Sequence, residues 1–264
     1  QVSTAVRESS SEMYDAREET HVPLTEIDLS DPLLVSYIES ANQDLDPTND
    51  IHQIYAYRSP EPEPANWDPG SVNNWFEGIR LLNGETIPAD MLFVSENPIY
   101  VEGDFNTTDF GTSNQKTVAV ISDAVNLLSE AWDDEREAGD DYGDIDRATE
   151  TTYNMAMITG NVPTPDGGGD YSGGLENLPR FHERWKNSSG SKVKCNINGA
   201  FINLFQSRQA TERWGKSGVY QPPERSWGYD PGLLDASVLR DLFPQAVSID
   251  RLVWEEGEPI LPGT

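Results

Sequence analysis

Short apolar runs separated by turn residues dominate the middle of the chain. The runs MLFV and IYVEGDF lie between Met91 and Phe105, split by Asn97-Pro98, a turn signal that a continuous central strand would not tolerate. TTYNMAMITGNV and KVKCNINGAFINLFQS have the same strand character, and we expect Gly199 to divide the second run or to mark a bend in it. The pattern predicts a mainly β chain.

Three other segments favour helices. KTVAVISDAVNLLSEAW predicts an amphipathic helix over residues 116–132, because large apolar residues recur in it at spacings of three and four: Val118, Ile121, Val125, Leu128 and Trp132. Residues 1–20 lack Gly and Pro, and we expect them to continue a helix whose earlier part is missing. A short helix is expected in LENLPRFHERW, where Pro179 occupies an early position at which its missing N–H is harmless.

Three strand-like runs each close on a Gly or Asn turn: IYVEGDFN, NMAMITGN and CNINGAF. Short strands whose turns return the chain to the same side are typical of a parallel β-helix. The runs recur only every 40 to 55 residues or so, which requires helices and loops between them. We therefore expect a mainly β fold with inserted helices and a parallel β-helix (solenoid-like) core; an antiparallel sandwich or an α+β sheet is the alternative.

This pattern divides the chain into three parts. Residues 1–80 are expected to form a helix remnant and an extended Pro-rich arm, in which PEPEP is a stiff spacer. Residues 81–231 are expected to form the β-rich core domain. Residues 232–264 are expected to form a C-terminal tail that packs on the core.

The charge balance excludes one class of partner and disfavours another. Asp and Glu number 46 against 18 Lys and Arg, for a net charge of −28 and a pI near 4.2. Nucleic acid is excluded because binding a polyphosphate needs clustered Lys and Arg, and anionic membrane surfaces are disfavoured for the same reason. An acid-rich, Lys-poor surface suits a salty medium that screens self-repulsion, although an ordinary acidic secreted protein has the same composition.

No apolar run approaches the length of a membrane span, so we expect no span in this chain. The chain begins at Gln1 rather than Met, and we expect an N-terminal segment to have been removed. Cys195 is the single cysteine, which excludes an intrachain disulfide; its alternating apolar surroundings predict a small core residue rather than a nucleophile.

Motifs for catalysis are missing from the sequence. There is no GxSxG, P-loop or GxGxxG, and GGGDYSGG lacks the Lys and the strand-to-helix context of a phosphate cradle, which makes it a turn. The three histidines, His21, His52 and His182, lack HExxH or paired spacing and are expected to be surface or packing residues. We expect no catalytic and no cofactor-binding residues, and hence no enzyme.

Calcium is the best candidate ligand, because hard cations take several carboxylate and carbonyl oxygens from acidic loops. One such loop carries Asp140, Asp141, Asp144 and Asp146. A second carries Asp104, Asn106 and Asp109. Neither loop matches the EF-hand register, and plain solvated acid is the competing interpretation.

Aromatic residues interleaved with arginines form the other candidate contact surface. The aromatic residues are Trp185, Trp214, Trp227 and Tyr229, and the arginines are Arg180, Arg184, Arg213 and Arg225. Such side chains could stack on a glycan or on a partner protein. Cation–π packing within a loop-rich domain explains the same pattern and is the favoured interpretation.

Several segments taken in order carry a family resemblance. They are ENPIYVEGDFN, VISDAVNLLSEAW, TTYNMAMITGNVPT, YSGGLENLPRFHERW, INGAFINLFQSRQATERW and VYQPPERSWGYDP. Over roughly residues 81–231 the chain resembles the extracytoplasmic C-terminal domain of bacterial type IV pilus assembly and minor-pilin-like proteins, most of them uncharacterised. In such proteins the domain follows a membrane-anchored helix, whose hydrophobic sequence is absent here. The resemblance implies an extracellular, β-solenoid-like, structural or adhesive role and carries over no catalytic residue.

The function expected from the sequence is that of a non-catalytic structural or adhesive protein of a bacterial surface appendage, either pilus-associated or a filament subunit. Self-assembly or contact with other appendage subunits is expected, at the cell surface or outside the cell. Two alternatives remain open: a β-helical carbohydrate-active enzyme and a calcium-stabilised binding module.

Overall fold

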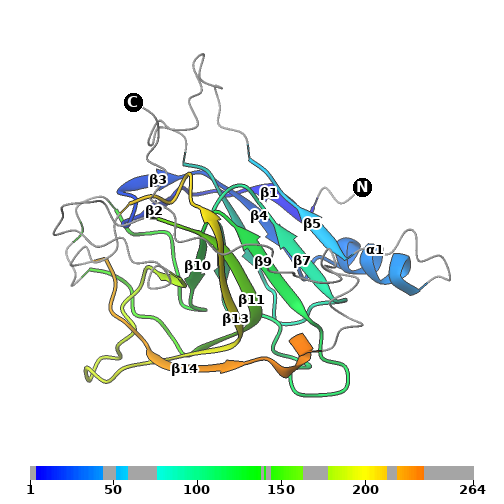
Figure 1. Ribbon diagram of the computed structural model, residues 1–264. Helices are drawn as coiled ribbons and strands as arrows, with labels where there is room; N and C mark the ends of the chain where they lie inside the picture. The colour runs from blue at the N-terminus through cyan, green and yellow to red at the C-terminus, as the bar shows by residue number, and fades with distance from the viewer. Residues whose placement is uncertain are drawn as a thin grey trace, which may run out of the picture.

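The computed structural model describes residues 4–43, 52–58, 76–137, 140, 144–162, 178–212 and 219–234. Within these ranges, twelve strands form two sheets of six. The first sheet has the order β1 (Val6–Glu8), β4 (Leu24–Asp28), β6 (Gly78–Leu82), β8 (Ile99–Glu102), β10 (Val125–Leu128) and β12 (Arg180–Phe181). The second has the order β14 (Glu224–Tyr229), β13 (Lys194–Gln206), β11 (Thr151–Asn161), β9 (Val118–Ser122), β7 (Met91–Val94) and β5 (Gln53–Tyr55), and faces the viewer in Figure 1.

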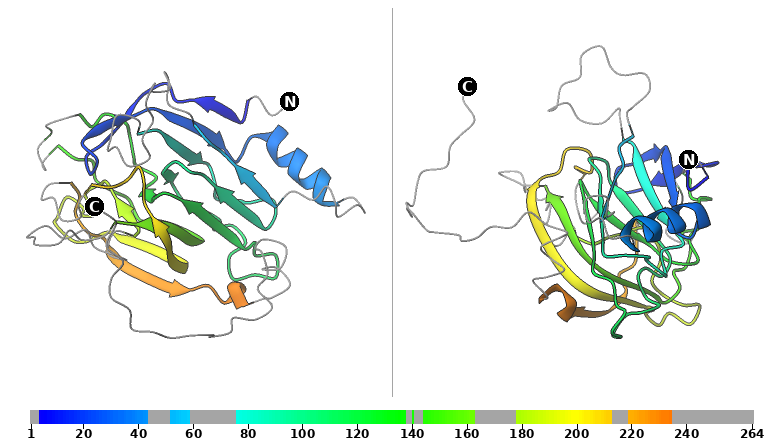
Figure 2. Two further views of the ribbon diagram at one scale, coloured as in Figure 1. Left: turned by 45° about the horizontal axis from the view of Figure 1, so that its top comes forward. Right: turned by 90° about the vertical axis from the view of Figure 1, so that its right-hand side faces the viewer.

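Strand pairing is parallel in both sheets apart from the antiparallel pair β1–β4. From β4 to β13, consecutive strands alternate between the two sheets. A separate antiparallel hairpin joins β2 (Met13–Asp15) to β3 (Thr20–Val22). Helix α1 (Pro32–Gln43) lies at one end of the sheets, and the 3₁₀ helix η2 (Pro231–Leu234) follows β14 (Figure 2).

The main core lies between the two sheets. Alternate residues of each strand point into it, as the period of two in a strand requires. The first sheet contributes Ile79, Leu81, Ile99, Val101, Val125 and Leu127, and the second contributes Met91, Phe93, Val118, Val120, Met155 and Met157. Cys195 is buried in the same core, which confirms its predicted packing role.

The predicted fold class is wrong. The structure is α/β, with two parallel-rich sheets and one helix in the described part of the chain, and no closed solenoid or β-helix is detected there. The parallel pairing also differs from the antiparallel sandwich that was the alternative. The strand-like runs, expected to be successive coils of one β-helix, are strands of two separate sheets. The edge strands are β1 and β12 in the first sheet and β5 and β14 in the second.

The helix predicted over residues 116–132 is also wrong. That stretch forms β9 and β10, with a bend between them at Asp123, whose carboxylate accepts N–H bonds from Arg208, Gln209 and Ala210 at 2.5, 3.0 and 2.7 Å. Almost every side chain of the two strands is buried, because parallel strands are covered on both faces. In residues 116–132 the apolar residues do not alternate strictly with polar ones, so spacings of three and four occur among them by coincidence.

Two further helix predictions are wrong. Residues 6–8 and 13–15 are strands, where a helix over 1–20 was expected, and LENLPRFHERW contributes β12 rather than a helix. The α-helix that does form lies in the predicted arm: Pro32 is its first residue, and the Asp31 carboxylate accepts the backbone N–H groups of Leu33 and Leu34 at 2.9 and 3.2 Å. The arm also supplies β4, an interior strand of the first sheet.

Other parts of the predicted arm and tail lie outside the described residues, including PEPEP and residues 235–264. At the start of the tail, Leu233 is buried against the second sheet. Gly199 does not divide its run into two strands, because β13 continues from Lys194 to Gln206. The strands expected at MLFV, IYVE and TTYNMAMITGN are confirmed.

Candidate functional site

Polar side chains stand in line across the outer face of the first sheet. The strand register places one from each of five neighbouring strands side by side: Glu26, Arg80, Tyr100, Asn126 and Arg180. We call these five residues the polar row. Adjacent strands lie about 5 Å apart, so each member is within reach of the next. All five are buried, which requires partners for their polar groups.

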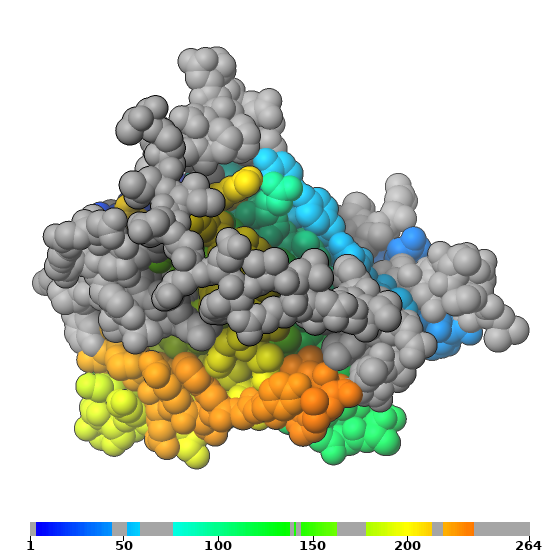
Figure 3. Space-filling model, in the orientation of Figure 1, coloured from blue at the N-terminus to red at the C-terminus, as the bar shows by residue number. Residues whose placement is uncertain are grey.

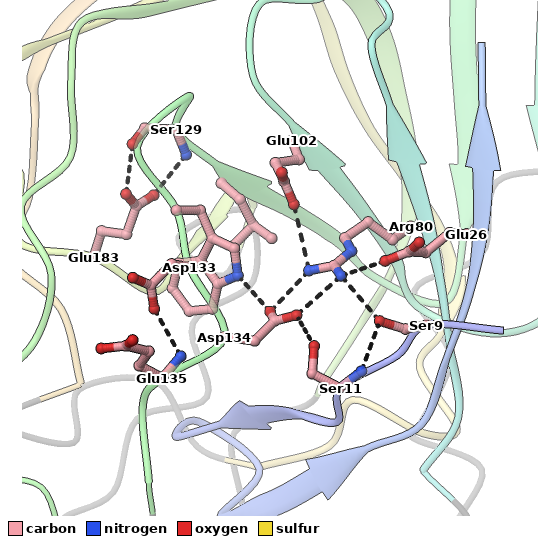
Figure 4. Close-up of polar contacts among 12 residues, drawn as sticks. Ser9, Ser11, Glu26, Arg80, Glu102, Ser129, Asp133, Asp134, Glu135 and Glu183 are labelled. Carbon is pink, nitrogen blue, oxygen red and sulfur yellow. Dashed lines mark hydrogen bonds and ion pairs between the residues drawn. The ribbon is translucent and has the colours of Figure 1, made fainter. Parts of the chain in front are cut away.

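Arg80 forms the first contact centre of the row (Figure 4). Its guanidinium donates to Asp134 at 2.8 and 3.0 Å, to Glu26 at 2.5 Å and to Ser9 Oγ at 3.1 Å, and it lies 3.3 Å from Glu102. Two acceptor oxygens of one carboxylate on a planar guanidinium make the strong bidentate geometry. Arg80 thereby joins the segment before the hairpin and the loop after β10 to the first sheet.

Asp134 adds two more contacts within these segments. Its carboxylate accepts the Trp132 indole N–H at 2.8 Å and the Ser11 hydroxyl at 2.6 Å. Burial raises the pKa of the neighbouring Glu102 carboxyl to about 7; Arg80 opposes the shift and Asp134 adds to it. The Asp134 carboxylate thus accepts hydrogen bonds from the Arg80 guanidinium, the Trp132 indole and the Ser11 hydroxyl. Few of its acceptor positions remain for a ligand.

The second contact centre is at the other end of the row, under the hairpin. Arg180 donates to Glu18, and the second oxygen of Glu18 accepts the backbone N–H groups of Thr211 and Glu212 at 3.2 and 3.1 Å. Glu18 and Arg180 are both almost fully buried. This ion pair fixes the hairpin loop and residues 211–212 on the same strand.

Asp15 and Tyr100 complete the second centre. The Tyr100 hydroxyl donates to Asp15 at 2.8 Å, and the other carboxylate oxygen accepts the backbone N–H groups of Arg17 and Glu18 at 2.8 and 3.1 Å. Burial raises the pKa of Asp15, but the positive charge around it, including Arg180, and the Tyr100 hydroxyl lower it to about 2. Asp15 is therefore an anion with every oxygen engaged.

His182 lies between Asn126 and Asp15. Its Nε2 lies 2.9 Å from Asn126 Oδ1, so Nε2 carries the proton, and Nδ1 is 3.8 Å from the nearest Asp15 oxygen. The imidazole packs against the rings of Tyr100 and Trp132, with centroids 5.8 and 6.3 Å away. Burial lowers the pKa of His182 to about 3, against the attraction of Asp15, so the ring is neutral at physiological pH.

Asp, His and Tyr side chains so arranged could in principle transfer protons. Access decides against proton transfer here, because Asp15, Tyr100 and His182 are all 0% exposed. A general base must reach the proton that it abstracts, and a neutral histidine with a pKa near 3 is a weak base. The hydrogen bond between Asp15 and Tyr100 instead holds the hairpin against the first sheet, and that between His182 and Asn126 fixes the imidazole beside β10.

Glu183 forms a smaller buried site next to the row. Its carboxylate accepts the backbone N–H of Ser129 at 2.6 Å and the Ser129 hydroxyl at 2.5 Å (Figure 4). Burial raises the pKa of Glu183 to about 7, although the two bonds from Ser129 lower it. Its protonation state therefore changes near neutral pH.

Three residues of the predicted calcium loops form hydrogen bonds within the protein itself. Asp104 accepts the Thr152 N–H at 2.6 Å, the Asn106 amide donates to Lys116 and Asn154 carbonyls at 2.9 and 3.0 Å, and Asp140 accepts the Glu137 N–H at 2.8 Å. Asp109, Asp144 and Asp146 lie in turns or loops, and Asp141 lies outside the described residues. Across the ranges that the structure describes, no group of three His, Cys, Asp or Glu side chains is placed to hold a metal ion. Calcium binding stays a prediction.

The aromatic candidates separate by burial. Trp185 is fully buried, edge-on to Phe181 with ring centroids 5.4 Å apart, and so packs in the core. Trp227 is half-buried beneath Arg225, whose guanidinium carbon is 4.8 Å from the ring centroid. Tyr229 is 54% exposed, and Trp214 lies outside the described residues.

Sequence reasoning missed the polar row, although a signal for it exists. Arg80 in GIRLL and Asn126 in VNLL are each the single polar residue of an otherwise apolar strand, and Glu26 lies between Thr25 and Ile27 in LTEID. Equivalent interruptions in successive strands of one sheet predict a line of polar side chains. Recognising it requires the strand register, which the mistaken helix over residues 116–132 concealed.

Comparisons with known proteins gave no match, whether to protein-family models, to curated proteins or to solved structures. Among the described helices, none is long and apolar enough to cross a membrane.

Proposed function

We propose that the protein is a non-catalytic structural or adhesive module of a bacterial surface appendage, working at the cell surface or outside the cell. One observation carries the proposal: within the described ranges, the charged and polar side chains of the two contact centres are buried and paired with one another. Arg80, Asp134, Asp15, Glu18 and Arg180 hold the hairpin and two loops on one sheet. Such a group supports a rigid module rather than a reaction.

Charge and segment order give independent support. A net charge of −28 suits an exposed, salt-screened setting and disfavours nucleic acid. The ordered segments over residues 81–231 resemble extracytoplasmic domains of pilus-associated proteins. We propose other appendage subunits or further copies of this chain as partners.

The carbohydrate-active alternative would require Asp and Arg side chains grouped on an open sheet face. Such a group exists on the first sheet, but the hairpin and residues 211–212 cover it. This geometry gives the alternative no support.

The proposal is tested by assembly. The full chain, purified at several concentrations and at low and high NaCl, is examined by electron microscopy and by size-exclusion chromatography with light scattering. Filaments, higher oligomers or binding to the surface of source cells are the expected results. A chain that stays monomeric at every concentration and associates with no cell surface contradicts the proposal.

A further inference from the structure

The outer face of the second sheet is apolar. The register places Val94, Ile121, Ile158 and Ile202 side by side across β7, β9, β11 and β13. A second line, two residues earlier on each strand, consists of Leu92, Ala119, Ala156 and Ala200. Their neighbours along the strands point into the main core, so these eight side chains point away from it. We call them the outer apolar face.

The end of the described chain lies on this face. Leu233 of η2 packs in one cluster with Leu92, Ala119 and Ala156. Asp230 fixes the turn before it, since its carboxylate accepts the Gly232 N–H and the Gln115 amide, both at 2.8 Å. Figure 3 shows β14 and η2, in orange, on the same side of the molecule as the second sheet. The chain therefore turns back over the sheet before it continues beyond Leu234.

Leu233 covers only part of the face. Val94, Ile121 and Ala200 are half-buried members of its cluster, and Ile202 is 37% exposed. Leu204, two residues further along β13, is 69% exposed. The exposed apolar side chains on this side of the sheet are thus those of β13, Ile202 and Leu204, next to the half-buried Ala200. Grouped apolar surface marks a place where another segment or molecule packs.

We propose that residues 235–264 of the same chain pack on the outer apolar face and complete its cover. Eleven of the 19 residues from 236 to 254 are apolar, although the whole chain is strongly acidic. Val238, Leu239, Leu242 and Phe243 recur at spacings of one, three and four, as on the apolar side of a helix. Val247 and Ile249 alternate with polar residues, as in a strand with one covered face.

Position favours this segment over a second copy of the chain. It starts at the face itself, so its effective concentration there is on the order of millimolar without any partner. Four strands at about 5 Å spacing span roughly 15 Å, which about ten helical residues cross. The 30 residues from 235 to 264 are more than sufficient.

Photo-crosslinking in the full chain tests the proposal. Ile202 is replaced by p-benzoylphenylalanine, and the matched control carries the same replacement at Leu33, an exposed apolar residue of α1. After irradiation, mass spectrometry should find crosslinks within one chain from position 202 to residues 235–264, and none from position 33. Crosslinks from position 202 to a second chain, or to no part of residues 235–264, overturn the proposal.

A chain ending at Leu234 provides a second measurement. Its amides in β9, β11 and β13 should exchange hydrogen at least about tenfold faster than in the full chain, because their covering layer is gone. A synthetic peptide of residues 235–264 should restore their protection. Unchanged exchange contradicts the proposal, and if the shortened chain does not fold, the crosslinking result in the full chain decides. Neither result depends on filament assembly, so the proposed function can fail separately.

Discussion

At the scale of single residues, two buried arginines of this protein, Arg80 and Arg180, form ion pairs with buried carboxylates. Glu18 illustrates the arrangement, because one oxygen accepts from Arg180 and the other from two backbone N–H groups. Removing one charge of such a pair leaves its partner uncompensated in a low-dielectric interior, whereas removing both does not. The free energies of unfolding of a single and a double variant separate these two cases.

The substitution Arg180→Met should lower the free energy of unfolding by about 3–5 kcal/mol, because Glu18 then remains as a buried charge without its cation. The double variant Arg180→Met with Glu18→Gln should recover at least about 1 kcal/mol of this loss. Urea denaturation measures both. Arg7→Met is the control: Arg7 pairs with Glu26 at 2.8 Å but is half exposed, so the loss should stay within about 1 kcal/mol. Additive effects of the two core substitutions would contradict the ion-pair explanation.

His182 should make the protein sensitive to acid. Its pKa is about 3 in the folded chain and 6.5 in the unfolded chain, so the unfolded state binds more protons between these values. The stabilisation is present above pH 6.5 and is lost as the pH falls toward 3, by up to about 5 kcal/mol. His182→Gln keeps an N–H donor for Asn126 but does not titrate, so its unfolding free energy should fall less between pH 6.5 and 4. The variant His21→Gln, at an exposed histidine, is the matched control for removing an imidazole; if His182→Gln keeps the natural slope, the assignment is wrong.

Glu183 has the opposite dependence. Its pKa is about 7 when folded and 4.5 when unfolded, so its contribution is full below pH 4.5 and declines as the pH rises through 7, by roughly 3 kcal/mol. Glu183→Gln should therefore be more stable than the natural chain at pH 8, with a smaller difference at pH 4.5. Thermal unfolding at the two pH values measures this. Glu85→Gln, at an exposed glutamate, is the matched control for the substitution itself; if Glu183→Gln gains no stability relative to the natural chain between pH 4.5 and pH 8, the assignment is wrong.

At the scale of the elements, burial on both faces removed the information that separates a strand from a helix. Val118–Ser122 and Val125–Leu128 carry almost no exposed side chain, and a run without alternation fits either period. Strands bounded by clear turns, such as Met91–Val94 and Ile99–Glu102, were predicted correctly. The polar row was not, because it exists only through pairing between strands that are distant in sequence.

Gly199 shows what a glycine contributes within such an element. A Cβ at this position would overlap the carbonyl oxygen of Met155 on β11, so the close approach of β11 and β13 requires glycine. Gly199→Ala should lower the free energy of unfolding by about 1–3 kcal/mol. Gly228→Ala on β14 is the matched control, because its Cβ would meet only the Asn198 side chain, at 3.3 Å. Equal losses in the two variants would show that backbone contact is not the reason for Gly199.

At the scale of the whole molecule, a net charge of −28 sets the balance between attraction and repulsion. The ion pairs of Arg80 and Arg180 are buried, and salt screens buried pairs much less than exposed charges. Repulsion among exposed carboxylates is screened within about 10 Å at moderate ionic strength. Added salt should therefore weaken the surface repulsion more than it weakens the buried ion pairs, although both are electrostatic.

The free energy of unfolding in urea should accordingly rise, on the order of 1 kcal/mol, as NaCl increases from about 0.05 to 1 M. Replacing three exposed acids, Glu12→Gln, Glu39→Gln and Glu224→Gln, should raise the stability at low salt and reduce the gain from added salt. Urea is uncharged, so the denaturant does not alter the screening. A fall in stability with NaCl would mean that salt weakens the ion pairs under the hairpin more than it relieves surface repulsion. The proposed setting in a salty exterior would then lose its physical support.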